Sequence, residues 1–63
     1  MSHIVAYVLM INIDNIMEEV AGVFANHEDA LKYAENNPLN GEVGYYIKFY
    51  HLASGKDFFI QYL

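Results

Sequence analysis

The sequence HIVAYVLMINI, from His3 to Ile13, determines the architecture of the fold. It carries no charge, and Asn12 is its only strongly polar residue after His3. The run is too short to cross a membrane as a helix, which needs about 20 apolar residues. Its content of Val, Ile, Leu and Tyr is typical of a β-strand. Since successive side chains of a strand point to opposite sides of a sheet, this strand has two apolar faces. We therefore predict a central strand whose two faces both need cover.

The chain has 63 residues and no linker or repeat, which predicts a single domain over residues 1–63. A domain of this size buries only about 60% of the surface that its unfolded chain exposes, so its stability is marginal. The chain has no Cys for a disulfide, and its three His residues are too far apart in sequence for a zinc motif. Because 56% of the residues are hydrophobic, we expect an unusually apolar core or self-association to stabilise the fold.

The formal net charge is −5, from eight acidic and three basic residues. This balance disfavours direct binding to nucleic acid or to an anionic membrane, since both depend on Lys and Arg. It permits a basic protein partner or mimicry of nucleic acid. The N-terminus has no basic segment before its apolar run, as a secretory signal would, so we expect a cytoplasmic protein.

The residues after this strand predict a hairpin and then a helix. Asp14-Asn15 favours a tight turn, and apolar spacing resumes over Ile16–Ala25, which predicts a second, antiparallel strand. Asn26 is a favourable N-cap, and acidic residues in the next positions suit a first helical turn. The sequence NNP at 36–38 ends the helix, so we expect it over about 27–36.

Two more strands are predicted in the second half of the chain. Asn40-Gly41 marks a turn, Val43–Leu52 has strand composition, a turn centred on Ser54-Gly55 follows, and Asp57–Leu63 is the fourth strand. The order ββαββ predicts an α+β fold, a four-stranded, mainly antiparallel sheet with one helix on one face. The expected strand order is 2-1-3-4, with the helix crossing over strand 1 in the right-handed sense.

The two hairpin turns assign strand residues to faces, because side chains alternate along each strand. The helix side is expected to carry a bulky apolar set: Val5, Tyr7, Leu9, Ile11, Ile13, Ile16, Val20, Gly22, Phe24, Ile47, Phe49, His51, Phe58, Ile60 and Tyr62. The other face would be mostly polar if it met water. It is apolar at its centre instead, and we predict a dimer or partner interface there, formed by Ile4, Ala6, Val8, Met10, Ala21, Val23, Tyr46, Tyr50 and Phe59.

A second copy of the chain, packing sheet to sheet, is the expected cover for this face, because two-fold dimers are the commonest oligomers. A different partner protein on the same face is the alternative. A partner would then meet the helix side or the sheet edges, and four acidic residues are candidates to face it: Glu28, Asp29, Glu35 and Glu42.

Residues for catalysis are not apparent in the sequence. Ser2 and Ser54 lie in a terminus and a turn without an elbow motif, and Glu18 and Glu19 are adjacent on a strand, so they point to opposite faces. We expect no enzyme, and no catalytic, metal or cofactor site. Two alternatives stay open: an acidic decoy for a nucleic-acid-binding protein, and a small-ligand domain or enzyme with a pocket between helix and sheet.

The run EEVAGVFANHEDALKYAE, followed by YYIKFYHL, resembles a group of short phage and prophage proteins. In that group a strand ending in Gly-Val-Phe leads into a capped helix, and a strand of the type Tyr-x-Ile-x-x-Tyr follows. The matching residues are Gly22, Val23, Phe24, Glu28, Ala30, Tyr33, Tyr45, Ile47 and Tyr50. Several small phage proteins of this size inhibit a host defence or metabolic protein. The resemblance therefore implies a protein-binding inhibitor of a host protein and supplies no catalytic residue; it does not extend to Asp57–Leu63.

Overall fold

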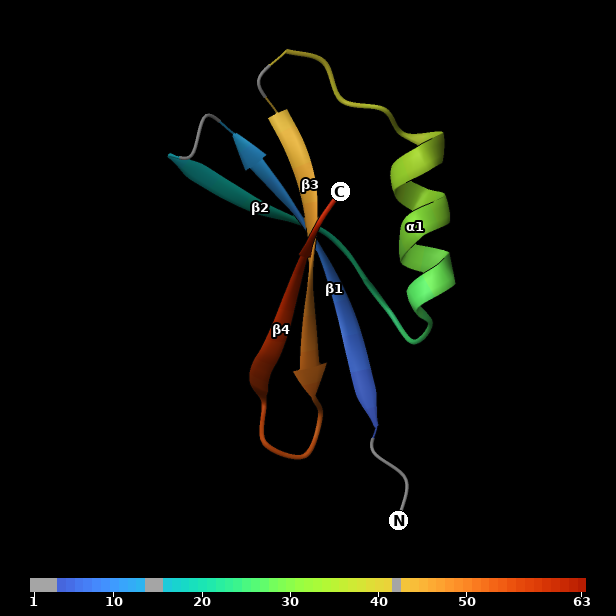
Figure 1. Ribbon diagram of the computed structural model, residues 1–63, viewed down its shortest axis with the longest axis vertical. Coiled ribbons are helices and arrows are strands. Elements are labelled where there is room, and N and C mark those ends of the chain that lie inside the picture. The colour runs from blue at the N-terminus through green and yellow to red at the C-terminus, as the bar shows by residue number, and fades with distance from the viewer. Residues whose placement is uncertain (1–3, 14–15, 42) are drawn as a thin grey trace.

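The computed structural model describes residues 4–13, 16–41 and 43–63 and has the predicted α+β fold. One helix lies beside a twisted, four-stranded antiparallel sheet of order β2-β1-β3-β4 (Figure 1). The elements are β1 Val5–Ile13, β2 Met17–Phe24, α1 His27–Asn36, β3 Val43–His51 and β4 Lys56–Tyr62. Strand β1 is central, as predicted, because it pairs with both β2 and β3.

Local signals in the sequence place the helix correctly. Asn26 is the N-cap residue with an extended backbone, and its side-chain amide donates a hydrogen bond to Asp29 Oδ2 at 3.2 Å rather than capping a backbone N–H. At the other end, the Tyr45 hydroxyl donates to the Asn37 carbonyl at 2.6 Å, which ties the residue after the helix to β3. Gly41 has a φ of 76°, the left-handed conformation that the predicted Asn40-Gly41 turn favours. The predicted Asp14-Asn15 turn lies outside the described residues.

The core is small and lies between α1 and the centre of the sheet. Leu9, Ala30 and Ile47 are fully buried, and Leu31 and Ala34 of the helix pack against them. Small side chains on the helix let it approach large side chains on the sheet. The helix contacts β1 and β2 but leaves most of β4 uncovered.

An aromatic cluster lies beside the core, at the N-terminal end of the helix where His27 is the first residue. The His27 ring lies 5.6 Å from Tyr7 and 5.4 Å from Phe49, and its Nε2–H donates to Gln61 Oε1 at 2.6 Å. Phe59 meets the Phe49 ring edge-on at 5.1 Å. These contacts are what joins β4 to the helix side of the molecule.

Two irregularities in strand pairing change which residues share a face. The β1–β2 register shifts between Leu9 and Met10, where Ala21 is the extra residue, and the β3–β4 register shifts between Phe49 and Tyr50, where Phe58 is extra. Each extra residue is a β-bulge, and it reverses the facing of everything beyond it. The second hairpin also closes with a His51–Lys56 pair and a four-residue turn, not the two-residue turn centred on Ser54-Gly55.

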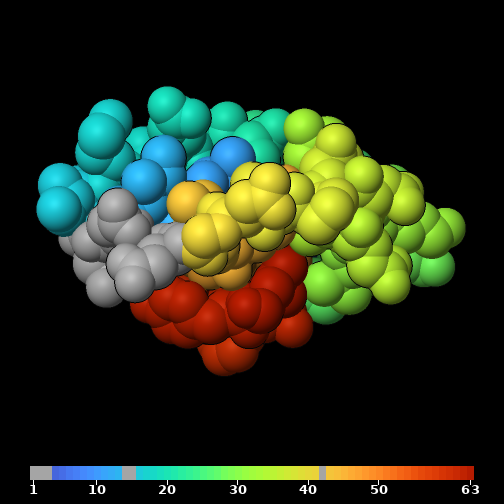
Figure 2. Space-filling view, turned by 90° about the horizontal axis from the view of Figure 1, so that it is seen from above, coloured from blue at the N-terminus to red at the C-terminus, as the bar shows by residue number. Residues whose placement is uncertain are grey.

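The chain exposes more surface than its mass requires. Its accessible surface is 4600 Å², whereas a folded monomer of 7.2 kDa exposes about 4100 Å². The molecule is correspondingly elongated, measuring 42 × 24 × 14 Å, and β4 forms one margin of it beside the α1–β3 connection (Figure 2). In the described part of the chain, no helix is long and apolar enough to cross a membrane.

Candidate functional site

The sheet face opposite α1, hereafter the open face, is the candidate site. Strand pairing identifies its residues, because directly paired residues of antiparallel strands point to the same side. They are Ala6, Val8, Met10 and Asn12 of β1; Glu18, Val20 and Val23 of β2; Gly44, Tyr46, Lys48 and Tyr50 of β3; and Asp57, Ile60 and Tyr62 of β4. The Leu52 N–H donates to the Ile4 carbonyl at 3.1 Å and extends the β1–β3 ladder, which adds these two residues.

Seven of the nine predicted interface residues lie on this face; Ala21 and Phe59 do not. Ala21 packs against the Leu9 cluster on the helix side, and Phe59 pairs with Phe49 there. The predicted facing was wrong for both, because it was counted from a hairpin turn without allowing for a bulge. The same bulges bring three residues to the open face that the sequence pattern placed under the helix: Val20, Ile60 and Tyr62.

One signal for the first bulge is visible in the sequence. Gly22 interrupts a strand pattern directly beside Ala21, and glycine inside a strand often marks a bulge. The second bulge has no such signal. Phe58 stacks on the His51 ring at a centroid distance of 4.0 Å, so its facing is set by a contact between strands.

The open face is apolar and hollowed near the start of β1. A depression of about 270 Å³ is lined by Ala6, Val8, Val23, Tyr50, His51, Leu52 and Gly55. Val23 and Leu52 at its rim are 66% and 57% exposed, whereas Ala6 in its floor is buried. An apolar hollow with exposed apolar walls is suited to receive an apolar side chain from another protein.

Polar groups gather at the opposite end of the open face around Tyr46, which is only 4% exposed. Its ring lies 5.6 Å from Tyr62, and Lys48 Nζ lies 5.9 Å from its centroid. Burial, then a hydrogen bond to Glu18 and the charge of that carboxylate, raise the pKa of Tyr46 to about 12. The hydroxyl therefore stays largely protonated, and keeps its hydrogen bond to Glu18, at pH values just above 10, where an ordinary tyrosine ionises.

This Tyr46 pKa predicts alkaline loss of stability. The folded-state value of about 12 exceeds the ordinary value of 10.0, so the stabilisation is fully present below pH 10 and is lost as the pH rises toward 12. Denaturant unfolding across that interval is expected to show a steeper decline for the wild type than for Tyr46→Phe. Equal slopes for the two proteins would contradict the assignment.

The predicted acidic residues that the structure describes do not form a single cluster, because Glu28 and Asp29 share the first turn of α1 whereas Glu35 lies toward its other end. Glu28 forms an exposed ion pair with Lys32 at 3.8 Å, Asp29 accepts from Asn26, and Glu35 is near the other end of the helix. Glu42 lies outside the described residues. The described members are all on α1 and none of them belongs to the open face.

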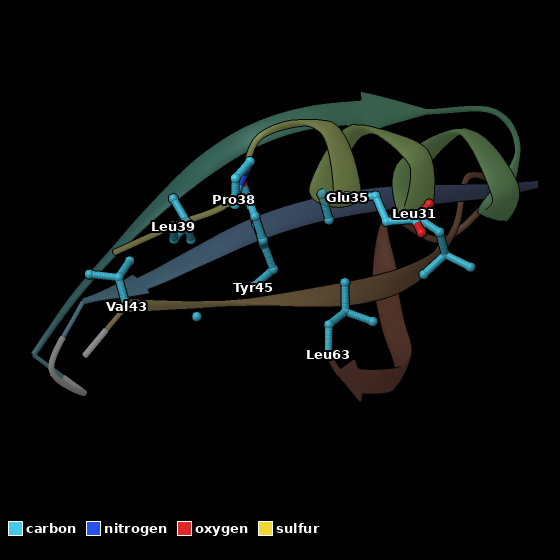
Figure 3. A pocket seen from close by; sticks show the side chains of 9 residues that line it. Leu31, Glu35, Pro38, Leu39, Val43, Tyr45 and Leu63 are labelled. Carbon is cyan, nitrogen blue, oxygen red and sulfur yellow. The ribbon is translucent and has the colours of Figure 1, made fainter. Parts of the chain in front are cut away.

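A separate groove of about 590 Å³ lies between the end of α1 and β3 (Figure 3). Its walls are Leu31, Ala34, Glu35, Pro38, Leu39, Val43, Gly44, Tyr45 and Leu63. The Tyr45 hydroxyl there is already bonded to the Asn37 carbonyl, and Glu35 is the single charged residue of this lining. The groove offers apolar contact without a set of converging polar groups to orient a substrate.

The chain has no significant match to a protein-family model, a curated protein or a solved structure.

Proposed function

We propose that this chain is a non-catalytic, cytoplasmic protein-binding module that acts as a homodimer and occludes a host protein, as a phage-type inhibitor does. The open face is the surface that meets the target, which is the alternative to a sheet-to-sheet dimer that the sequence left open. The observation that carries the proposal is the apolar hollow beside Val23 and Leu52, on a face whose margins stay exposed. Exposed apolar surface gathered in one place, with polar groups toward its border, is typical of protein interfaces.

The charge distribution favours occlusion through the open face over mimicry of nucleic acid. A decoy needs acidic groups in a row with phosphate-like spacing, whereas Glu28, Asp29 and Glu35 lie on the helix and Glu18 and Asp57 on the opposite side of the sheet. Binding through apolar contacts should also depend little on salt, whereas a decoy's binding should weaken steeply.

Val23→Asp is expected to abolish capture of the target, because it places a charge at the rim of the apolar hollow. The immobilised chain is exposed to bacterial lysate, the retained protein is identified by mass spectrometry, and its binding is repeated with purified components at low and high salt. Met17→Asp is the matched control: it lies on the same strand, on the helix side of the sheet, and is 56% exposed compared with 66% for Val23.

Retention of the target by Met17→Asp and its loss by Val23→Asp would support the proposal. Equal capture by both variants, or a steep loss of wild-type binding with salt, would refute the role of the open face.

A further inference from the structure

The outer edge of β4 presents a regular array of backbone groups with which no described strand pairs. The Leu63 N–H donates to the Tyr45 carbonyl at 3.1 Å, so residue 63 points its backbone groups toward β3. Because this direction alternates along an antiparallel strand, Gln61 also faces β3, whereas Ile60 and Tyr62 direct their N–H and C=O groups away from the sheet. Such an edge is a template for another strand.

The side chains of β4 are exposed on both faces of the sheet. On the helix side, Phe59 is 55% exposed, and on the open face Tyr62 is 75% exposed. A partner that covers only one face of the sheet leaves either Phe59 or Tyr62 exposed to water. An added strand beside β4 shields both groups at once, since its own side chains also alternate between the faces.

Charge distinguishes β4 from the other edge of the sheet. Residues 58–63 carry no charged side chain, although the whole chain has a net charge of −5. The charges of β4, Lys56 and Asp57, and its bulge at Phe58 lie at the start of that strand, whereas β2 carries Glu18 and Glu19 and is interrupted in its middle by the bulge at Ala21. Pairing two copies through β2 near Glu18 and Glu19 would bring like charges together, whereas pairing through residues 59–63 of β4 brings none together.

We propose that two copies of this chain pair antiparallel through β4, with the two-fold axis at Gln61. In that register Ile60 lies opposite the partner's Tyr62 on the open face, and Phe59 lies opposite the partner's Leu63 on the helix side. The outward groups of Ile60 and Tyr62 then form four backbone hydrogen bonds across the axis. The result is one continuous eight-stranded sheet with both helices on the same side.

This assignment rests on the proposed homodimer and gives the second copy a place that leaves the open face free. The two open faces join into one surface for the target. The chain exposes more surface than a typical monomer of this mass, as expected if the β4 edge and the open face are both buried by partners.

Ile60→Pro is the decisive variant, because proline removes an outward N–H without removing a bond to β3. Ile60→Ala is the matched control, since it shortens the side chain and keeps the N–H. Light scattering across a range of concentrations should give twice the 7.2 kDa monomer mass for the wild type and for Ile60→Ala. Ile60→Pro, which loses two hydrogen bonds per dimer, should dissociate with a dimer Kd raised on the order of tenfold or more.

Amide hydrogen exchange on the wild type gives a second readout that needs no variant. The Ile60 and Tyr62 amides should be protected at high protein concentration and lose this protection on dilution. A monomeric wild type would overturn both the homodimer and this interface. A dimer that survives Ile60→Pro, unprotected Ile60 and Tyr62 amides, or dissociation by Val23→Asp in place of Ile60→Pro would overturn the β4 interface alone.

Discussion

Leu9→Ala is expected to lower the free energy of unfolding by about 3 kcal/mol, the typical cost of the lost methyl groups and the cavity they leave. Within the described part of the chain, Leu9 and Ile47 are the large side chains that are completely buried. A domain of 63 residues is stable by roughly 3–9 kcal/mol in total, so one such substitution removes a large share of it. The thermal midpoint should fall by at least about 12 °C.

Leu52→Ala is the control for this experiment, because it makes the same chemical change at a side chain that is 57% exposed. It should cost less than about 1 kcal/mol, since surface substitutions away from a core contact have small effects. Both variants are compared with the wild type by denaturant unfolding at one protein concentration, because association adds to apparent stability. Similar losses for Leu9→Ala and Leu52→Ala would show that the core has been placed wrongly.

Gly22→Val should destabilise the fold by about 1–3 kcal/mol, because the strand needs the space that glycine leaves. A Cβ at this position would lie 2.8 Å from two ring atoms of Phe24. The ring has to move, although it packs against the Leu9 cluster and lies 5.8 Å from Tyr33. Gly22 does not have a positive φ, so a valine there is not strained in its backbone, and the cost is steric.

Gly44→Val tests this explanation, because a Cβ at Gly44 meets nothing within 4 Å. That variant should be neutral or slightly stabilising, since Val favours a strand. In a double-mutant cycle, Gly22→Val should cost much less in a Phe24→Ala background. The steric account fails if Gly22→Val is as harmless as Gly44→Val, or if the Phe24→Ala background leaves its cost unchanged.

Local patterns were sufficient for the elements and their order. Asn26 and the NNP sequence at 36–38 predict the helix that the structure places at His27–Asn36, because caps and proline act on neighbouring residues. The apolar side chains on both faces of β1 likewise predict its central position. Strand order 2-1-3-4 follows from short connections and one crossover, and it is confirmed.

The candidate site was predicted only in part: of the nine residues predicted for it, seven lie on the open face. Those seven include every residue that was predicted from β1 and β3, whose pairing is continuous along the whole of both strands. The errors, at Ala21 and Phe59, lie in the edge strands β2 and β4, each of which contains a bulge. Val20, Ile60 and Tyr62 were assigned to the wrong face for the same reason.

HIVAYVLMINI therefore specified a central strand with two apolar faces, because alternation is a property of the strand alone. The composition of the second face depended on contacts between residues far apart in the chain. Phe58 stacks on His51 and Phe59 meets Phe49 edge-on, and both contacts require the extra residue in β4. A bulge shifts every later side chain by one position, so the open face and the edge of β4 took shape only when the strands had paired.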